Sequence, residues 1–135
     1  MMKKSIESYL QSLIDCVNSS DDIDALWLYG SHAKKSAGPE SDIDLAVLFN
    51  SYDMNPLERR VRPELLAIEW QQQLNLKGGD ISVLDLEIAP IPLAMSVLQT
   101  GKLLVNKNRS HEFRVSQEIM SKWEIDYQYH YKNHG

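Results

Sequence analysis

A glycine–serine pair and two aspartates one residue apart are the residues of this sequence that could do chemistry together. Gly30 and Ser31 follow an apolar run, and ten residues separate Ser31 from Asp42, the first aspartate of the Asp42-x-Asp44 pair. Glycine lets the backbone turn sharply and approach a ligand closely, and the N–H groups that begin a helix favour anions. The pattern predicts a phosphate-binding turn that faces a divalent-metal site.

The two aspartates open an apolar run, residues 42–49, that predicts a buried strand. Successive side chains of a strand point to opposite faces, so the carboxylates of Asp42 and Asp44 share one face, roughly 6–7 Å apart at Cβ. Hard cations such as magnesium bind carboxylates and leave positions for phosphate and water. Two ions about 3.5–4 Å apart stabilise both the incoming and the leaving oxygen in phosphoryl transfer. Asp80, the first residue of the next predicted strand, is the candidate third ligand and would help to deprotonate an attacking hydroxyl.

Other polar side chains near this pattern have two interpretations. Asp85 competes with Asp80 as the third carboxylate, although two-residue alternation places it on the opposite face. His32 is either a phosphate contact or, the favoured interpretation, a surface residue of a first helical turn. Three arginines of a later helix either reach the nucleotide or an acidic partner, or form an exposed helix face: Arg59, Arg60 and Arg62.

Apolar spacing predicts helices and strands that alternate around this pattern. Strands are expected over residues 25–29, 42–49, 80–86 and 103–105. Helices are expected over residues 5–18, from 55 to about 76, before Gly101 and from about 108, and Ser31 is expected to cap a helical turn at 32–35. Pro63 is expected to kink or restart its helix. Apolar side chains are expected inside the second and last long helices: Leu57, Val61, Leu65, Ile68 and Leu76, and Phe113, Ile119, Met120, Trp123 and Tyr127.

Length and composition predict a single α/β domain over residues 1–135, with a C-terminal helix and aromatic tail from about 108. The chain has 135 residues, 43% hydrophobic and 24% charged, which is typical of a globular protein. Its net charge of −5 argues against nucleic-acid binding. Cys16 is the single cysteine, which excludes an internal disulfide. We expect a cytoplasmic protein, because there is neither a signal-peptide pattern nor a run of 18 apolar residues.

The Gly-Ser pair, the ten residues after it and Asp-x-Asp together resemble the signature of the DNA polymerase beta-like nucleotidyltransferase superfamily. The later segment IAPIPLAMSVLQTGKLLV is similar to the closing helix and strand of its smallest members. These are the MNT proteins, minimal nucleotidyltransferases encoded beside a HEPN-domain ribonuclease as antitoxin and toxin. The resemblance covers residues 20–106 and implies a polymerase beta-like fold, a small mixed sheet flanked by helices.

The resemblance also implies a magnesium-dependent antitoxin that transfers AMP from ATP to a hydroxyl of its HEPN toxin, typically a tyrosine. By motif position, Gly30 and Ser31 would bind the nucleotide, and three aspartates would hold the metal ions, of which two are expected: Asp42, Asp44 and Asp80.

The sequence departs from the family pattern after the Gly-Ser pair. Members of the family often continue with Arg-Ala-Arg-Gly, whereas this chain has His32, Ala33, Lys34 and Lys35. The basic character is kept, but the bidentate fork of arginine is lost. Lys34 and Lys35 are therefore either triphosphate contacts or part of a solvated face.

Two other functions are compatible with the sequence. One is a non-catalytic antitoxin that blocks its toxin by contact alone. The other is nucleotide transfer to a small molecule such as an aminoglycoside, although relatives of that kind usually carry an extra helical domain. The aromatic cluster at 123–131 predicts either a surface that docks a partner or core packing by the last helix.

Overall fold

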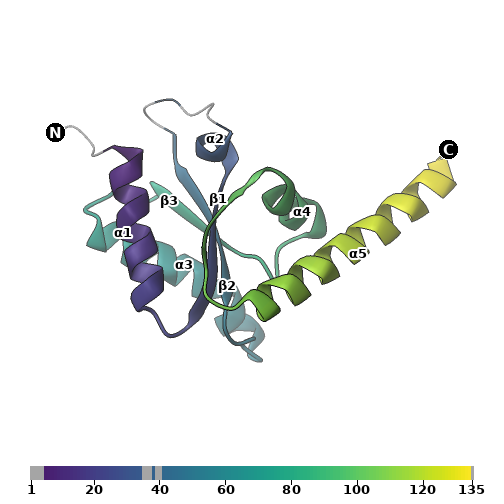
Figure 1. Cartoon of the computed structure of the whole chain (residues 1–135), viewed down its shortest axis with the longest axis horizontal. Coiled ribbons are helices and arrows are strands. Elements are labelled where there is room, and N and C mark those ends of the chain that lie inside the picture. The colour runs from purple at the N-terminus through teal and green to yellow at the C-terminus, as the bar shows by residue number, and fades with distance from the viewer. Residues whose placement is uncertain (1–4, 35–37, 39–40, 135) are drawn as a thin grey trace.

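A four-stranded mixed sheet forms the centre of the molecule (Figure 1). The computed structural model describes residues 5–34, 38 and 41–134, and their side chains as far as residue 126. The strand order is β3-β2-β1-β4: β1 (Ile23–Tyr29) runs antiparallel to β2 (Ile43–Phe49) and β4 (Lys102–Asn106), and β3 (Ile81–Asp85) runs parallel to β2. The predicted α/β fold with a small mixed sheet is confirmed.

Helices α1 (Ile6–Ser19) and α3 (Pro56–Gln73) cover one face of the sheet (Figure 1). The α1 helix begins as a capped helix should, with the Ser5 hydroxyl accepting from the N–H of Ser8. Its apolar stripe, Tyr9, Leu13 and Val17, is buried in one core cluster with side chains of α3 and the strands. These are Ala67 and Trp70 of α3, Leu26 of β1, and Leu45 and Val47 of β2. The predicted helix over residues 5–18 is confirmed.

Helices α4 (Ile91–Thr100) and α5 (Arg109–His134) cover the opposite face. They bury Ala94, Val97, Val115 and Ile119 against the strand residues that point to this face, such as Trp27 and Leu48. Helix α5 continues beyond this contact and projects from the body (Figure 1). It is helical as far as His134, because residues 109–134 contain neither glycine nor proline to end it. The side chains of the aromatic tail beyond residue 126 lie outside the described residues.

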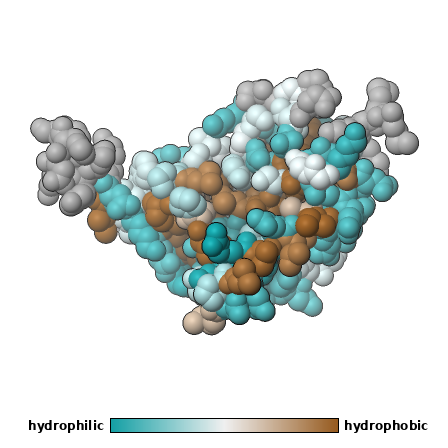
Figure 2. Space-filling model, turned by 180° about the vertical axis from the view of Figure 1, so that it is seen from behind, coloured by the Kyte–Doolittle hydropathy of each residue, from teal (hydrophilic) through white to brown (hydrophobic). Residues whose placement is uncertain are grey.

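Three of the five residues predicted on the inward face of α3 are exposed, whereas Val61 and Leu76 are partly buried. Leu57, Leu65 and Ile68 are 72%, 61% and 49% exposed, whereas Ala67 and Trp70 are buried. The wide indole of Trp70 sets which side of the helix faces the sheet, and the three aliphatic side chains are left on other sides. Apolar residues are visible among hydrophilic ones on the face of the molecule that is turned away in Figure 1 (Figure 2).

Two further details of the helices differ from the prediction. Helix α3 begins as expected, with Asn55 as cap and Pro56 in the first turn, but it does not restart at Pro63 and continues through it as one helix. Pro63 is buried, so packing outweighs the loss of its hydrogen bond. Phe113 of α5 is 64% exposed, because Val115 and Ile119 make the contact with the sheet.

None of the helices in the described part of the chain combines the length and the apolar character that a membrane span requires.

Candidate active site

The two ends of the predicted motif meet where β1 ends and β2 begins. Antiparallel pairing sets Tyr29 opposite Asp44, so the next residue, Gly30, lies beside the Asp44 side chain. The backbone of Gly30 has a φ of 71°, which residues with a Cβ rarely adopt. A Cβ at this position would overlap Oδ2 of Asp44 and lie 3.1 Å from its Cγ. Backbone conformation and the closeness of the carboxylate therefore both require glycine here.

The two aspartates are electrostatically coupled. Partial burial raises the pKa of the Asp44 carboxyl, the charge of Asp42 raises this pKa further, and His32 lowers it. The pKa of the Tyr29 phenol is also raised, first by burial and then by the negative charge of Asp44. Negative charge is thus concentrated where β1 ends and β2 begins. A cation bound there would favour the ionised form of Asp44.

The short helix α2 (Gly30–Ala33) carries the residues predicted to contact phosphate. It begins at Gly30, and Tyr29 occupies the N-cap position. Ser31 therefore lies inside the first turn, and the prediction that it caps the helix was wrong. The reason is the positive φ of Gly30, which turns the chain directly at the end of the strand.

The residues that follow Ser31 lie close to the start of β2. His32 is partly buried, and its Nε2 lies 3.2 Å from the carbonyl oxygen of Ser41. This contact brings the imidazole near the aspartate pair, as its effect on the pKa of Asp44 indicates. Lys34 ends the helix with an exposed side chain, and Lys35 lies outside the described residues.

Asp80 does not join Asp42 and Asp44 in the predicted cluster of three ligands. It precedes β3, and its Oδ2 accepts a hydrogen bond of 2.8 Å from the N–H of Lys77, which closes the turn between α3 and β3. Its backbone carbonyl accepts from the N–H of Ile43 at 2.9 Å. Among the residues that the structure describes, no three His, Cys, Asp or Glu side chains are placed to hold a metal ion.

The strand residue paired with Asp44 is Ser82, which sequence reasoning missed. In the parallel pairing of β2 and β3, Asp44 is the partner of Ser82 and Ile43 is the partner of Ile81. Two-residue alternation from Asp80 would have indicated the correct face for Ser82. Alternation fixes the face but does not distinguish Asp80 from Ser82, because a shift of two residues keeps the same face, and the observed pairing identifies Ser82.

Asp85 points to the opposite face, as predicted. It is 2% exposed, and its Oδ2 lies 3.7 Å from Nη2 of Arg62 on α3. Burial raises the pKa of the Asp85 carboxyl, and this effect outweighs the hydrogen bond from Glu87 and the charge of Arg62, which lower it. Asp85 is therefore a structural carboxylate in the layer between the sheet and α3.

The arginines of α3 do not form one uniform exposed face. Arg62 packs over the ring of Phe49 at 3.9 Å and donates to the carbonyl oxygen of Ser51 at 3.0 Å. Arg59 lies over the ring of Tyr52 at 4.5 Å and donates to the carbonyl oxygen of Asp53 at 2.8 Å. Arg60 is exposed. Two of the three arginines thus stabilise the segment that joins β2 to α3.

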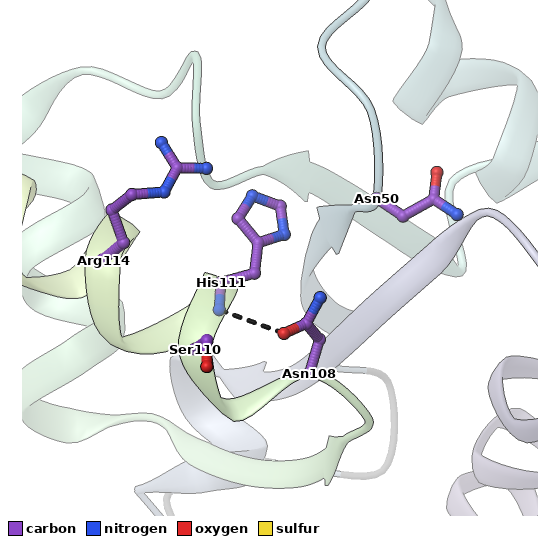
Figure 3. A pocket seen from close by; sticks show the side chains of 5 residues that line it. All are labelled: Asn50, Asn108, Ser110, His111 and Arg114. Carbon is purple, nitrogen blue, oxygen red and sulfur yellow. Dashed lines mark hydrogen bonds between the residues drawn. The ribbon is translucent and has the colours of Figure 1, made fainter.

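A pocket lies at the other end of the sheet, lined by Asn50, Asn108, Ser110, His111 and Arg114 (Figure 3). Asn50 follows β2, whereas Asp44 lies near its start, so about 20 Å of strand separates the two places. His111 is held there by Asp24 and Glu87, at 2.8 Å and 3.4 Å. The pocket is therefore not part of the aspartate site.

Comparison with known protein families identifies the family of the chain that carries this site. Residues 11–110 match the family model described as "Polymerase beta, Nucleotidyltransferase". The chain belongs to the polymerase beta nucleotidyltransferase family. The match includes the Gly30–Asp44 motif and the whole sheet, so the nucleotidyltransferase domain is the body of this protein. No curated protein matches the sequence.

Solved structures share the fold of this nucleotidyltransferase. One is described as a crystal structure of a toxin–antitoxin with AMP-PNP, with 22% identity, coverage of 89% of this chain and 88% of the other, and a TM-score of 0.65. Another is a tri-AMPylated HEPN toxin from Shewanella oneidensis in complex with an MNT antitoxin, with 20% identity, coverage of 87% and 86%, and a TM-score of 0.63. A MntA-HepT toxin–antitoxin structure gives 21% identity, coverage of 87% and 86%, and a TM-score of 0.62.

Proposed function

We propose that this nucleotidyltransferase is an antitoxin that transfers AMP from ATP to a tyrosine hydroxyl of a HEPN ribonuclease toxin. The observation that carries the proposal is the contact between Gly30 and Asp44, which joins a phosphate-binding turn to a pair of carboxylates. The partner and the nucleotide are suggested by structures of the same fold, described as a toxin–antitoxin with AMP-PNP and as a tri-AMPylated HEPN toxin with its antitoxin.

In the transfer, the tyrosine oxygen forms a bond to the α-phosphorus of ATP, the bond from that phosphorus to the α,β-bridging oxygen breaks, pyrophosphate leaves, and the phenol proton passes to solvent water. The chain contributes position and charge rather than covalent chemistry. Gly30 turns the chain and leaves room for the Asp44 carboxylate beside the phosphate-binding turn, and Ser31 offers a hydroxyl and an N–H. Lys34 is the described lysine closest in sequence to this turn and would neutralise phosphate charge.

Asp42 and Asp44 would hold magnesium. Their oxygens are the hard ligands that this ion prefers. Partial burial, and then the charge of Asp42, raise the pKa of the Asp44 carboxyl, and a bound cation would lower it. Bound magnesium would neutralise the phosphates and stabilise the charge on the leaving pyrophosphate. Asp42 and Asp44 supply the carboxylate oxygens of the proposed site, whereas Oδ2 of Asp80 accepts the N–H of Lys77.

The proposal is tested by incubating the protein with ATP labelled at the α-phosphate, magnesium and a purified HEPN toxin, the proposed partner. We expect label on the toxin and loss of its ribonuclease activity. The control is the double variant Asp42→Ala, Asp44→Ala. Equal labelling by the wild type and the double variant would refute the proposal.

A contact inhibitor is the second candidate, and the absence of a three-carboxylate cluster among the described side chains favours it. Such an antitoxin would bind the toxin and block it without transfer. The same double variant discriminates the two functions, because a contact inhibitor without either carboxylate would still neutralise the toxin fully.

A further inference from the structure

The position beside Asp44 on the neighbouring strand is occupied by Ser82. The two residues are partners in the parallel pairing of β2 and β3, and neighbouring strands are about 4.8 Å apart. Leu84, two residues further along β3, packs with the α4 and α5 core, whereas Ile81 and Val83 pack with the α1 and α3 core. Alternation therefore directs Ser82 to the face that carries Asp44, and its side chain is exposed there.

The acidic residue nearest to this position along β3 is engaged elsewhere. Asp80 lies before the strand, and one of its carboxylate oxygens accepts the N–H of Lys77. In return, the N–H of Asp80 donates to the carbonyl oxygen of Lys77 at 3.1 Å. The two bonds form a closed turn over residues 77–80. The side-chain bond that closes this turn therefore holds Oδ2 of Asp80 toward Lys77.

We propose that Ser82 is the contribution of β3 to the metal site, which therefore consists of two carboxylates and one hydroxyl. The proposal rests on the proposed function in one respect, since it takes Asp42 and Asp44 as the ligands of a divalent ion. A hydroxyl is neutral, and the affinity of an oxygen-ligand site increases with the number of charged ligands. The site consequently binds a divalent ion more weakly than it would with a carboxylate at position 82.

The same geometry determines where a single substitution would complete the site. Ser82→Asp places a carboxylate beside Asp44 on the same face, without change to the turn that contains Asp80. The exposed position of Ser82 leaves space for the larger side chain. Ser82→Asn has nearly the same shape without the charge and is the matched control.

The test is a titration of each purified variant with Mn²⁺, followed by electron paramagnetic resonance of the free ion, with neither ATP nor toxin present. We expect Ser82→Asp to bind Mn²⁺ at least tenfold more tightly than the wild type, and Ser82→Asn to stay within about twofold of it. Asp80→Asn is expected to lower the melting temperature, because its turn is weakened, and to leave the Mn²⁺ affinity within about twofold. Asp44→Asn is expected to abolish binding.

Two results would overturn the assignment of Ser82. One is a tenfold loss of Mn²⁺ affinity in a folded Asp80→Asn variant. The other is the absence of any gain in Ser82→Asp, including the case in which no variant binds the ion. Because the titration requires no toxin, its failure is distinguishable from failure of the proposed transfer: the predicted Mn²⁺ affinities with no labelled toxin would refute the protein acceptor and leave the role of Ser82 intact.

Discussion

The side chain of Asp44 lies directly against the Cα of Gly30, and this contact joins the phosphate-binding turn to the carboxylate pair. Residues fourteen positions apart in the sequence are brought together because β1 and β2 are antiparallel and the chain turns at the end of β1. The contact has a direct consequence for substitution. A methyl group at position 30 can be accommodated only if the Asp44 carboxylate moves.

Gly30→Ala is expected to reduce both stability and transfer. The positive φ and the overlap with Asp44 together cost about 2–4 kcal/mol in the free energy of unfolding. Displacement of the carboxylate by about 1 Å is expected to lower the transfer rate by about a hundredfold. Chemical denaturation and the toxin-labelling assay measure the two effects.

The chain offers a matched control for the backbone part of this effect. Gly79 also has a positive φ, 89°, but a Cβ there would meet nothing within 4 Å. Gly79→Ala should cost only the backbone strain, about 1–2 kcal/mol, and Gly78→Ala should be within about 0.5 kcal/mol of the wild type. If Gly30→Ala is no worse than Gly79→Ala, the contact with Asp44 has no energetic importance.

Asp44→Asn is expected to stabilise the metal-free protein at neutral pH. The pKa of Asp44 is raised in the folded state, so ionisation of this carboxyl opposes folding at pH 7. The destabilisation by ionised Asp44 is complete above the raised pKa, and it disappears as the pH falls through that pKa towards the usual value of 3.8. We expect a melting temperature higher by about 2 °C at pH 7 and a difference that vanishes near pH 3.

Magnesium should reverse this order. An ion that binds only the folded wild type raises its melting temperature, whereas Asp44→Asn should not respond. Scanning calorimetry at several pH values, with and without magnesium, measures both effects. A variant that is less stable than the metal-free wild type at pH 7 would contradict the assigned electrostatic cost.

The sequence predicts the fold better than the site, for physical reasons that particular residues illustrate. Buried strands such as Ile43–Phe49 are identified by their continuous apolar character, and the turn at Gly30 by its glycine. The partner of Asp44 could not be found in this way. Asp80 and Ser82 lie on the same face by alternation, and only the observed register of β2 and β3 identifies Ser82 as the neighbour of Asp44. The inward side of α3 depends in the same way on a tertiary contact, that of Trp70.

Arg62→Met is expected to destabilise the protein by leaving Asp85 buried without a countercharge. The Asp85 carboxylate is 2% exposed, and Arg62 is the cation beside it. Loss of one member of a buried pair costs about 3–5 kcal/mol. The Arg62 side chain is 23% exposed, so solvent screens the pair and we expect a loss of about 2 kcal/mol. Arg60→Met, on the exposed side of the same helix, should change stability by less than about 0.5 kcal/mol.

The pH dependence of this loss provides the stricter test. Loss of Arg62 should raise the pKa of Asp85, which burial already raises. The variant should therefore approach the wild type in stability as the pH falls and Asp85 becomes protonated, because a neutral carboxyl needs no countercharge. Urea denaturation between pH 4 and pH 8 measures the difference. A loss that is equal at all pH values would indicate that the packing of Arg62 on Phe49, rather than the ion pair, is what matters.

His111→Ala is expected to loosen the start of α5. The imidazole contacts Asp24 of β1 at 2.8 Å and Glu87 at 3.4 Å, so it ties the last helix to β1 and to the segment that follows β3. Its removal leaves two partly buried carboxylates without this partner and should cost about 1–3 kcal/mol. Arg114→Ala, one turn further along, removes only an exposed pair with Glu118 and should cost less than about 0.5 kcal/mol. Hydrogen exchange of residues 109–119 should increase in the first variant and not in the second; equal protection in both would show that Val115 and Ile119 hold the helix without His111.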